Sequence, residues 1–127
     1  MKVKFYYCPH CHNLIYMAQD SGVNPYCCNE PMKELRANTT DGAIEKHVPV
    51  VSVDETTHQV HIKVGSVPHP MLDNHHIVFI AASTNLGVRI FNTLDLNEAG
   101  ISFYLNEDEK LDRVYEYCNL HGLWADK

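Results

Sequence analysis

The cysteines constrain this chain most, because four of the five fall in a short N-terminal segment. Cys8 and Cys11 form a knuckle whose sulfurs can converge on one ion, and a later cysteine pair completes a tetrahedral four-thiolate site. Segment 1–36 has too few apolar residues for a core of its own, so we expect it to need its metal to fold. Iron and zinc both fit. Cys27 and Cys28 are neighbours, which predicts a distorted tetrahedron.

A second group of donors lies further along the chain. Cys118 and His121 are three positions apart, so both side chains can reach one ion from a single turn. His47, His69 and His75 are available to join them. Taken singly, each of these histidines is more often a surface or core residue than a ligand. Together, four imidazoles and one thiolate would leave one position of an octahedral metal open, as a catalytic site requires.

From His47 onward the pattern is that of β-strands. Short β-branched or aromatic runs are bounded by Gly, Pro, Asp and Asn. These runs are 48–53, 60–64, 77–82 and 88–91. Strands at this spacing predict a β-sandwich. Segment 33–46 is expected to be a connection with one helical turn, and 111–117 is ambiguous between helix and strand.

Composition narrows the class of protein. The chain has 127 residues, of which 45% are hydrophobic and 20% charged, as in globular proteins, and no apolar run is long enough to span a membrane. The net charge of −6 argues against a nucleic-acid partner, which would need a basic face. The N-terminus reaches a cysteine too soon to hold the apolar core of a signal peptide. We therefore expect a cytoplasmic protein, in which cysteine spacing indicates metal binding in preference to disulfides.

Several strings match, in order, the motifs of one family. They are Tyr7-Cys8-Pro9-His10-Cys11, Cys27-Cys28-Asn29, Glu45-Lys46-His47-Val48-Pro49-Val50, Lys63-Val64-Gly65, His69-Pro70-Met71 and Glu116-Tyr117-Cys118-Asn119-Leu120-His121-Gly122. With these strings the chain resembles desulfoferrodoxin, the two-iron class of superoxide reductase, over nearly its full length. The resemblance implies a mainly β fold, in which a small desulforedoxin-like or rubredoxin-like metal domain, 1–36, precedes an immunoglobulin-like β-sandwich, 37–127.

The resemblance also implies a role for each candidate residue. The ligands of a distorted tetrahedral electron-transfer iron would be Cys8, Cys11, Cys27 and Cys28, with zinc possible there in a recombinant sample. The four equatorial nitrogens of a second, catalytic iron would come from His47, His69, His75 and His121, with Cys118 as the axial sulfur. Glu45 matches the carboxylate that can bind the ferric ion after product release, and Lys46 matches the cation beside the open position.

The activity implied is one-electron reduction of superoxide to hydrogen peroxide, with re-reduction by an external donor such as rubredoxin, in a homodimer. One departure is visible: His76 stands where relatives often carry an aromatic residue. His75 is preferred as the ligand because its six-residue offset from His69 fits the family pattern.

Two other classes of protein remain open. One is an electron carrier in which only the four-cysteine iron is redox-active, and the other is a structural zinc-ribbon sandwich. Several further residues are expected to have no catalytic role: His58 and His61 as exposed or edge residues, and Trp124, Tyr115 and Tyr117 as core. The sequence Asn38-Thr39-Thr40 matches a glycosylation sequon, which has no meaning in a reducing cytosol.

Overall fold

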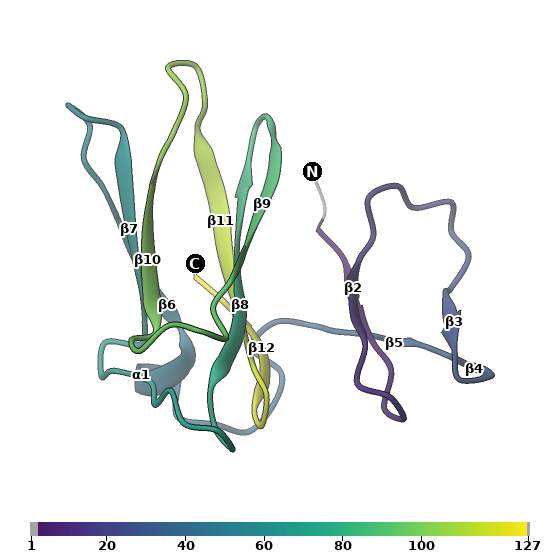
Figure 1. Cartoon of the computed structure of the whole chain (residues 1–127). Coiled ribbons are helices and arrows are strands. Elements are labelled where there is room, and N and C mark those ends of the chain that lie inside the picture. Colours follow the sequence, from purple (N-terminus) through teal and green to yellow (C-terminus); the bar gives the residue numbers. More distant parts are fainter. Residues whose placement is uncertain (1–2, 127) are drawn as a thin grey trace. The chain divides into compact units, whose positions relative to one another are not determined.

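The computed structural model describes residues 3–126, and the chain divides into two compact units, Met1–Arg36 and Ala37–Lys127 (Figure 1). The paired strands of both units are antiparallel. No helix within residues 3–126 is long and apolar enough to cross a membrane.

The first unit has two small sheets. Strands β1 (Phe5–Tyr7), β2 (Leu14–Tyr16) and β5 (Lys33–Glu34) form a sheet in the order β2-β1-β5, while β3 (Tyr26–Cys27) and β4 (Glu30–Pro31) form a hairpin. Its buried core cluster consists of Tyr6, Cys8 and Met32, with Ile15, Met17 and Cys27 packed against it. A core this small supplies little stabilisation, so a bound metal would contribute much of the folding free energy of this unit.

The second unit is a β-sandwich of a three-stranded and a four-stranded sheet. The first sheet has the order β10-β7-β6, from β6 (Pro49–Val53), β7 (Gln59–Val64) and β10 (Gly100–Tyr104). The second has the order β12-β11-β8-β9, from β8 (Ile77–Thr84), β9 (Gly87–Asn92), β11 (Leu111–Cys118) and β12 (Gly122–Ala125). The mainly β fold class predicted from sequence is confirmed.

Alternation along the strands explains the core of the sandwich. In β7, Val60, Ile62 and Val64 are buried while His61 and Lys63 are exposed, as the two-residue period of a strand requires. Strand β8 is buried at seven of its eight positions, as expected of a strand with a partner strand on each side. The two sheets bury one shared apolar cluster, which fixes the ends of the strands and the loops between them.

Some elements differ from the sequence-based expectation. The ambiguous segment 111–117 lies in strand β11, and strands β10 and β12 were not predicted. In β12, Leu123, Trp124 and Ala125 are all buried, so the strand has no alternation to detect. The expected helical turn is present as α1 (Ile44–His47). His58 and His61 are exposed, and Tyr115, Tyr117 and Trp124 are buried, as predicted.

The two ends of the sandwich carry different loops. Helix α1, the β7–β8 loop and the β11–β12 turn gather at the lower end in Figure 1, and the β6–β7, β8–β9 and β10–β11 loops lie at the upper end. At the upper end the buried Glu109 carboxylate accepts hydrogen bonds from the Thr84 hydroxyl at 2.7 Å and the Asn106 backbone N–H at 3.0 Å, and pairs with Arg89. Burial tends to raise the pKa of this carboxyl, but these bonds outweigh it and hold the pKa below its usual value.

Candidate metal centres

Four cysteines of the first unit converge on one point. The sulfurs of Cys8, Cys11, Cys27 and Cys28 all lie within 4.8 Å of one another. Cys8 is buried, whereas Cys11 and Cys28 are exposed, so one side of the cluster faces solvent. The Cys11 backbone N–H points at the Cys8 sulfur and, against the effect of burial, lowers the pKa of that thiol to about 6. This favours the thiolate, which is the form that binds metal.

The turn of the β3–β4 hairpin explains how neighbouring cysteines both face the cluster. In an extended strand, successive side chains point to opposite faces. Cys28 and Asn29 have φ of 53° and 63°, in the left-handed region that favours two-residue hairpin turns. This bend brings both sulfurs to the same side. For a non-glycine residue such a backbone costs roughly 1–3 kcal/mol, so the strain expected of adjacent ligands lies in the main chain.

A second cluster lies at the lower end of the sandwich. His47 ends α1, His69 and His75 come from the loop between β7 and β8, Cys118 ends β11, and His121 lies in the turn before β12. The donor atoms of His47, His75, Cys118 and His121 all lie within 4.8 Å of one another. The His69 ring lies beside those of His47 and His75, with centroid distances of 4.8 and 4.6 Å.

The four imidazoles form a closed ring. Centroids of His47 and His121 are 4.8 Å apart and those of His75 and His121 are 5.2 Å apart, which completes the circuit through His69. Neighbouring planes meet at 69° to 79°. Rings that stand edge to face in this way can direct one nitrogen each toward a common centre.

Backbone carbonyls orient two of these rings. The Nδ1 atoms of His47 and His69 lie 2.7 Å from the carbonyl oxygens of Ala43 and Pro70. Because a carbonyl oxygen only accepts hydrogen bonds, the proton of each ring lies on Nδ1, and Nε2 keeps a free lone pair that can bind a metal. Within residues 3–126, the buried Nε2 atoms of His47, His69 and His75 have no hydrogen-bond partner. Such orphaned buried nitrogens are expected of metal ligands.

Burial also prepares the cluster chemically. It lowers the pKa of His47 and His75, and that of His69 to about 4. These imidazoles are therefore neutral at pH 7 and have a free lone pair. Burial raises the pKa of the Cys118 thiol, and a cation would be needed to favour its thiolate. Imidazole and thiolate together suit first-row transition metals.

His121 is held by contacts that the sequence did not reveal. Its Nδ1 lies 3.7 Å from the Cys118 sulfur, whereas the Nδ1 atoms of His47 and His69 are bonded to carbonyl oxygens. Its carbonyl accepts hydrogen bonds from the Thr40 hydroxyl and, at 3.0 Å, from the Trp124 indole N–H. Trp124 also stacks on His47, with centroids 4.9 Å apart. The core residue Trp124 therefore contacts two members of the cluster.

The sequon segment has a structural role. The Asn38 amide donates to the Ala125 carbonyl at 3.2 Å and accepts from the Ala125 N–H at 3.0 Å. These bonds fasten the start of the second unit along β12. They also place Thr40 beside His121.

Glu45, Lys46 and His76 lie around the cluster. Glu45 and Lys46 are exposed on α1 next to His47. The positive charge of Lys46 contributes to the lowered pKa of His75, after the larger effect of burial. The Nδ1 atom of His76 lies 2.8 Å from the Leu72 carbonyl. Neither His76 nor His69 belongs to the group of donor atoms that lie within 4.8 Å of one another, but the His69 ring packs against two rings of that group.

Glu116, two residues before Cys118, was not singled out as a buried residue by the sequence. Its side chain is fully buried, and neither carboxyl oxygen has a hydrogen-bond partner within residues 3–126. Burial raises its pKa to about 9, so the carboxyl is neutral at pH 7. It lies in strand register between Ile80 and Trp124. A charged residue type within an otherwise apolar strand breaks the apolar pattern, and this break was the sequence signal that could have drawn attention to Glu116.

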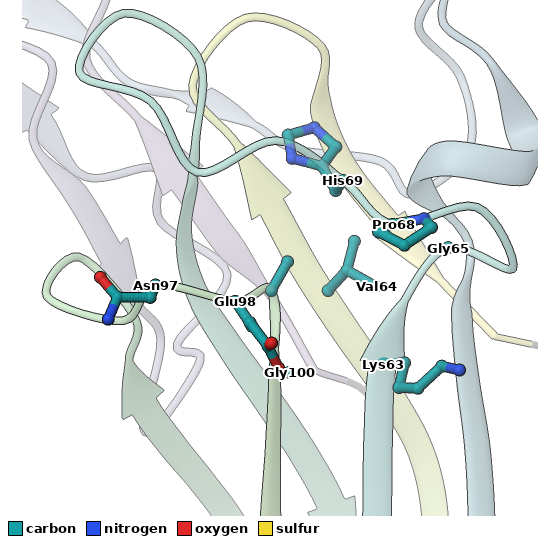
Figure 2. Close-up of a pocket in the computed structure, with 9 residues that line it drawn as sticks. Lys63, Val64, Gly65, Pro68, His69, Asn97, Glu98 and Gly100 are labelled. Carbon is teal, nitrogen blue, oxygen red and sulfur yellow. The ribbon is translucent and has the colours of Figure 1, made fainter.

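A surface pocket of about 320 Å³ lies beside His69 (Figure 2). Its lining includes Lys63, Gly65, Pro68 and Glu98. His69 is the one ring of the cluster in that lining, and neither Glu45 nor Lys46 takes part. The pocket therefore borders the β7–β8 loop and does not form the approach to the cluster on the Lys46 side.

The comparisons with known proteins agree with this architecture. A family model described as Desulfoferrodoxin matches residues 39–127. A desulfoferrodoxin of Nitratidesulfovibrio vulgaris is 39% identical over 122 residues, covering 95% of this chain and 93% of that protein. A desulfoferrodoxin homolog of Methanothermobacter thermautotrophicus is 40% identical over 119 residues, covering 92% of each. The crystal structure of the superoxide reductase from Treponema pallidum aligns over 100% of both chains, with a TM-score of 0.83 and 33% identity.

The fold and the two donor clusters define a class of β metalloprotein with one four-thiolate site and one site of imidazoles and a thiolate. Similarity over nearly the whole chain narrows this class to one family. The chain belongs to the desulfoferrodoxin family, and the resemblance drawn from its motifs is confirmed.

Proposed function

We propose that this chain is a superoxide reductase, which reduces superoxide to hydrogen peroxide by one electron at a ferrous site. The reaction consumes one superoxide, one electron and two protons for each peroxide formed. The observation that carries the proposal is the closed ring of four imidazoles beside the Cys118 sulfur, with three orphaned Nε2 atoms. The superoxide reductase with the same fold over its full length supports it.

The proposed catalytic ligands are His47, His69, His75 and His121 with Cys118. A ferrous ion held there would supply the electron and one exchangeable coordination position. The Cys118 thiolate would donate electron density to that ion. Five protein donors leave room for one small anion, which suits superoxide.

Charge around the site favours an anionic substrate. A divalent ion and one thiolate would leave a net charge of about +1, since an imidazole that binds a metal ion does so in its neutral form. The exposed Lys46 ammonium adds a second positive charge close to His75. The chain as a whole has a net charge of −6. Because charges are screened over roughly 8 Å at physiological ionic strength, the positive charges close to the site determine how an anion approaches it. Lys46 would attract superoxide, and Glu45 would close the oxidised site after product leaves.

The first unit would be the family's desulforedoxin-like iron domain, residues 1–36, with ligands Cys8, Cys11, Cys27 and Cys28. The second, 37–127, would be the catalytic domain. A reduced carrier such as rubredoxin would reset the oxidised catalytic iron, and the four-cysteine iron could relay that electron. The family resemblance further implies a homodimer. Five unpaired cysteines suit the cytoplasm.

Metal counting on chain produced without added metal tests the iron assignment. Two irons per chain support the reductase, one redox-active iron supports a simple electron carrier, and zinc without colour supports a structural sandwich. A superoxide-consumption assay with a reductant present then tests the reaction. One peroxide formed per superoxide is expected, whereas one peroxide per two superoxides would indicate dismutation and refute the proposal.

A further inference from the structure

Asn119 joins two of the loops that supply donors to the second cluster. It follows Cys118 in the β11–β12 turn. Its backbone N–H and both polar atoms of its side chain form hydrogen bonds to the loop before β8. Its backbone N–H donates to the His76 carbonyl at 3.1 Å, and its side-chain Oδ1 accepts from the His76 N–H at 2.8 Å. Its Nδ2 donates to the Asn74 carbonyl at 3.1 Å.

The loop held in this way contains His75. Leu72 and His75 close it with mutual backbone bonds of 2.8 and 3.2 Å, and the His76 ring is bonded to the Leu72 carbonyl. The loop is thus tied internally. The bonds of Asn119 to residues 74 and 76 then fix it relative to Cys118 and His121.

The position of the His75 ring depends on these bonds to the backbone more than the positions of the His47 and His69 rings do. The rings of His47 and His69 are each oriented by a carbonyl at Nδ1. Within residues 3–126, the His75 ring has no such bond, and its buried Nε2 also lacks a partner. The position of its ring nitrogen therefore follows from the position of its main chain.

We propose that Asn119 is the positioning residue for His75: its side chain locks residues 74 and 76 against the Cys118–His121 turn, and so holds the His75 nitrogen at the metal. This inference rests on the proposed ligand set of the second cluster. Asn119 is not itself one of the proposed ligands. Partners that orient metal-binding groups commonly change metal affinity by about 10- to 100-fold when they are replaced.

Asn85 offers a matched control in the same unit. Its Nδ2 donates to the Asp108 carbonyl at 3.0 Å and its Oδ1 accepts from the Lys110 N–H at 2.6 Å. It therefore makes the same kind of amide bridge between two loops, at the upper end of the sandwich. Its replacement removes similar bonds without touching the cluster.

The experiment is a Co²⁺ titration of the full chain against a competing chelator, followed by visible absorption. The variants are Asn119→Ala, Asn119→Asp, Asn85→Ala, Asn85→Asp and His75→Ala. The four-cysteine site contributes the same bands to every variant, so difference spectra report the second site. Asn119→Ala should weaken Co²⁺ binding there by about 10- to 100-fold, and its ligand-field bands should shift toward those of His75→Ala. Asn119→Asp keeps the acceptor for the His76 N–H and should lose less.

The Asn85 variants should keep wild-type affinity and bands. An Asn119→Ala protein with affinity within twofold of wild type and unshifted bands would overturn the inference, and so would an equal loss in Asn85→Ala. If Asn119→Ala does not fold, Asn119→Asp against Asn85→Asp decides in the same way. His75→Ala with unchanged Co²⁺ bands would instead refute the ligand set, and with it the proposed function.

Discussion

Replacement of Gly65 by alanine should destabilise the second unit strongly. Gly65 follows β7 with φ of +82°, and a Cβ there would lie 2.5 Å from the Val67 carbonyl oxygen. It would also lie 2.7 Å from the Glu45 carbonyl oxygen and from the Lys46 carbonyl carbon. All three atoms are main chain and cannot rotate away.

The magnitude follows from two separate costs. A left-handed backbone costs a non-glycine residue roughly 1–2 kcal/mol. Overpacking against fixed neighbours costs about 1–3 kcal/mol more. We therefore expect Gly65→Ala to lower the free energy of unfolding by about 2–5 kcal/mol, which is a large share of the roughly 5–15 kcal/mol typical of a domain.

Urea denaturation of the metal-free chain measures this loss. The single tryptophan, Trp124, is buried in the second unit, so its fluorescence reports the unfolding of that unit. Gly87→Ala is the control, because Gly87 also has positive φ, at +146°, but a Cβ there meets nothing within 4 Å. It should show the backbone cost alone. If Gly65→Ala loses no more stability than Gly87→Ala, the steric argument is wrong.

Three further outcomes are expected. In stopped-flow measurements, Lys46→Ala should slow superoxide capture about tenfold at low salt, within the range of electrostatic steering, and should flatten the salt dependence of the rate. Lys63→Ala makes the same change in net charge and should have neither effect. An unchanged salt dependence in Lys46→Ala would contradict the proposal that Lys46 attracts superoxide. The folded pKa of Glu109 lies below its usual 4.5, so its stabilisation is present above that pH and is lost as pH falls toward the folded pKa. Glu109→Gln should therefore be less stable at pH 7 and lose less stability on acidification below about pH 4.5, as urea midpoints would record; a parallel decline in both proteins refutes this. Because Trp124 stacks on His47 at 4.9 Å, Co²⁺ binding should quench its fluorescence and Zn²⁺, with its filled d shell, should not; equal quenching by both ions would count against a metal beside that ring.

Much of the fold was accessible from local patterns. The period of two in 60–64 predicted β7, and the apolar run 77–82 predicted β8, because these strands pack a face or both faces on the core. Strand β12 was not predicted, since its run of four residues is too short to show a period or to separate a strand from other structure. Its existence depends on pairing with β11, a contact between residues that only the folded chain brings together.

The residue types of the candidate site were visible in the sequence, but their supports were not. Metal-binding side chains are a small chemical set, so His47 or Cys118 can be selected by type and motif. The carbonyls of Ala43 and Pro70 are present at every residue and carry no sequence signal. Thr40 lies far along the chain from His121, and nothing in its local sequence indicates that its hydroxyl reaches that carbonyl.

The separation of the two ends of the sandwich has a practical consequence. All residues of the imidazole and thiolate cluster lie in the loops and element ends at the lower end, whereas the β6–β7 turn around Thr56 and Thr57 is exposed at the upper end. That turn is a suitable place to insert an affinity tag or attach a fluorescent label. The apolar core between the two sheets separates this turn from the cluster, so a tag or label there should not move the donor atoms. A tethered or immobilised chain should therefore keep its metal-binding properties.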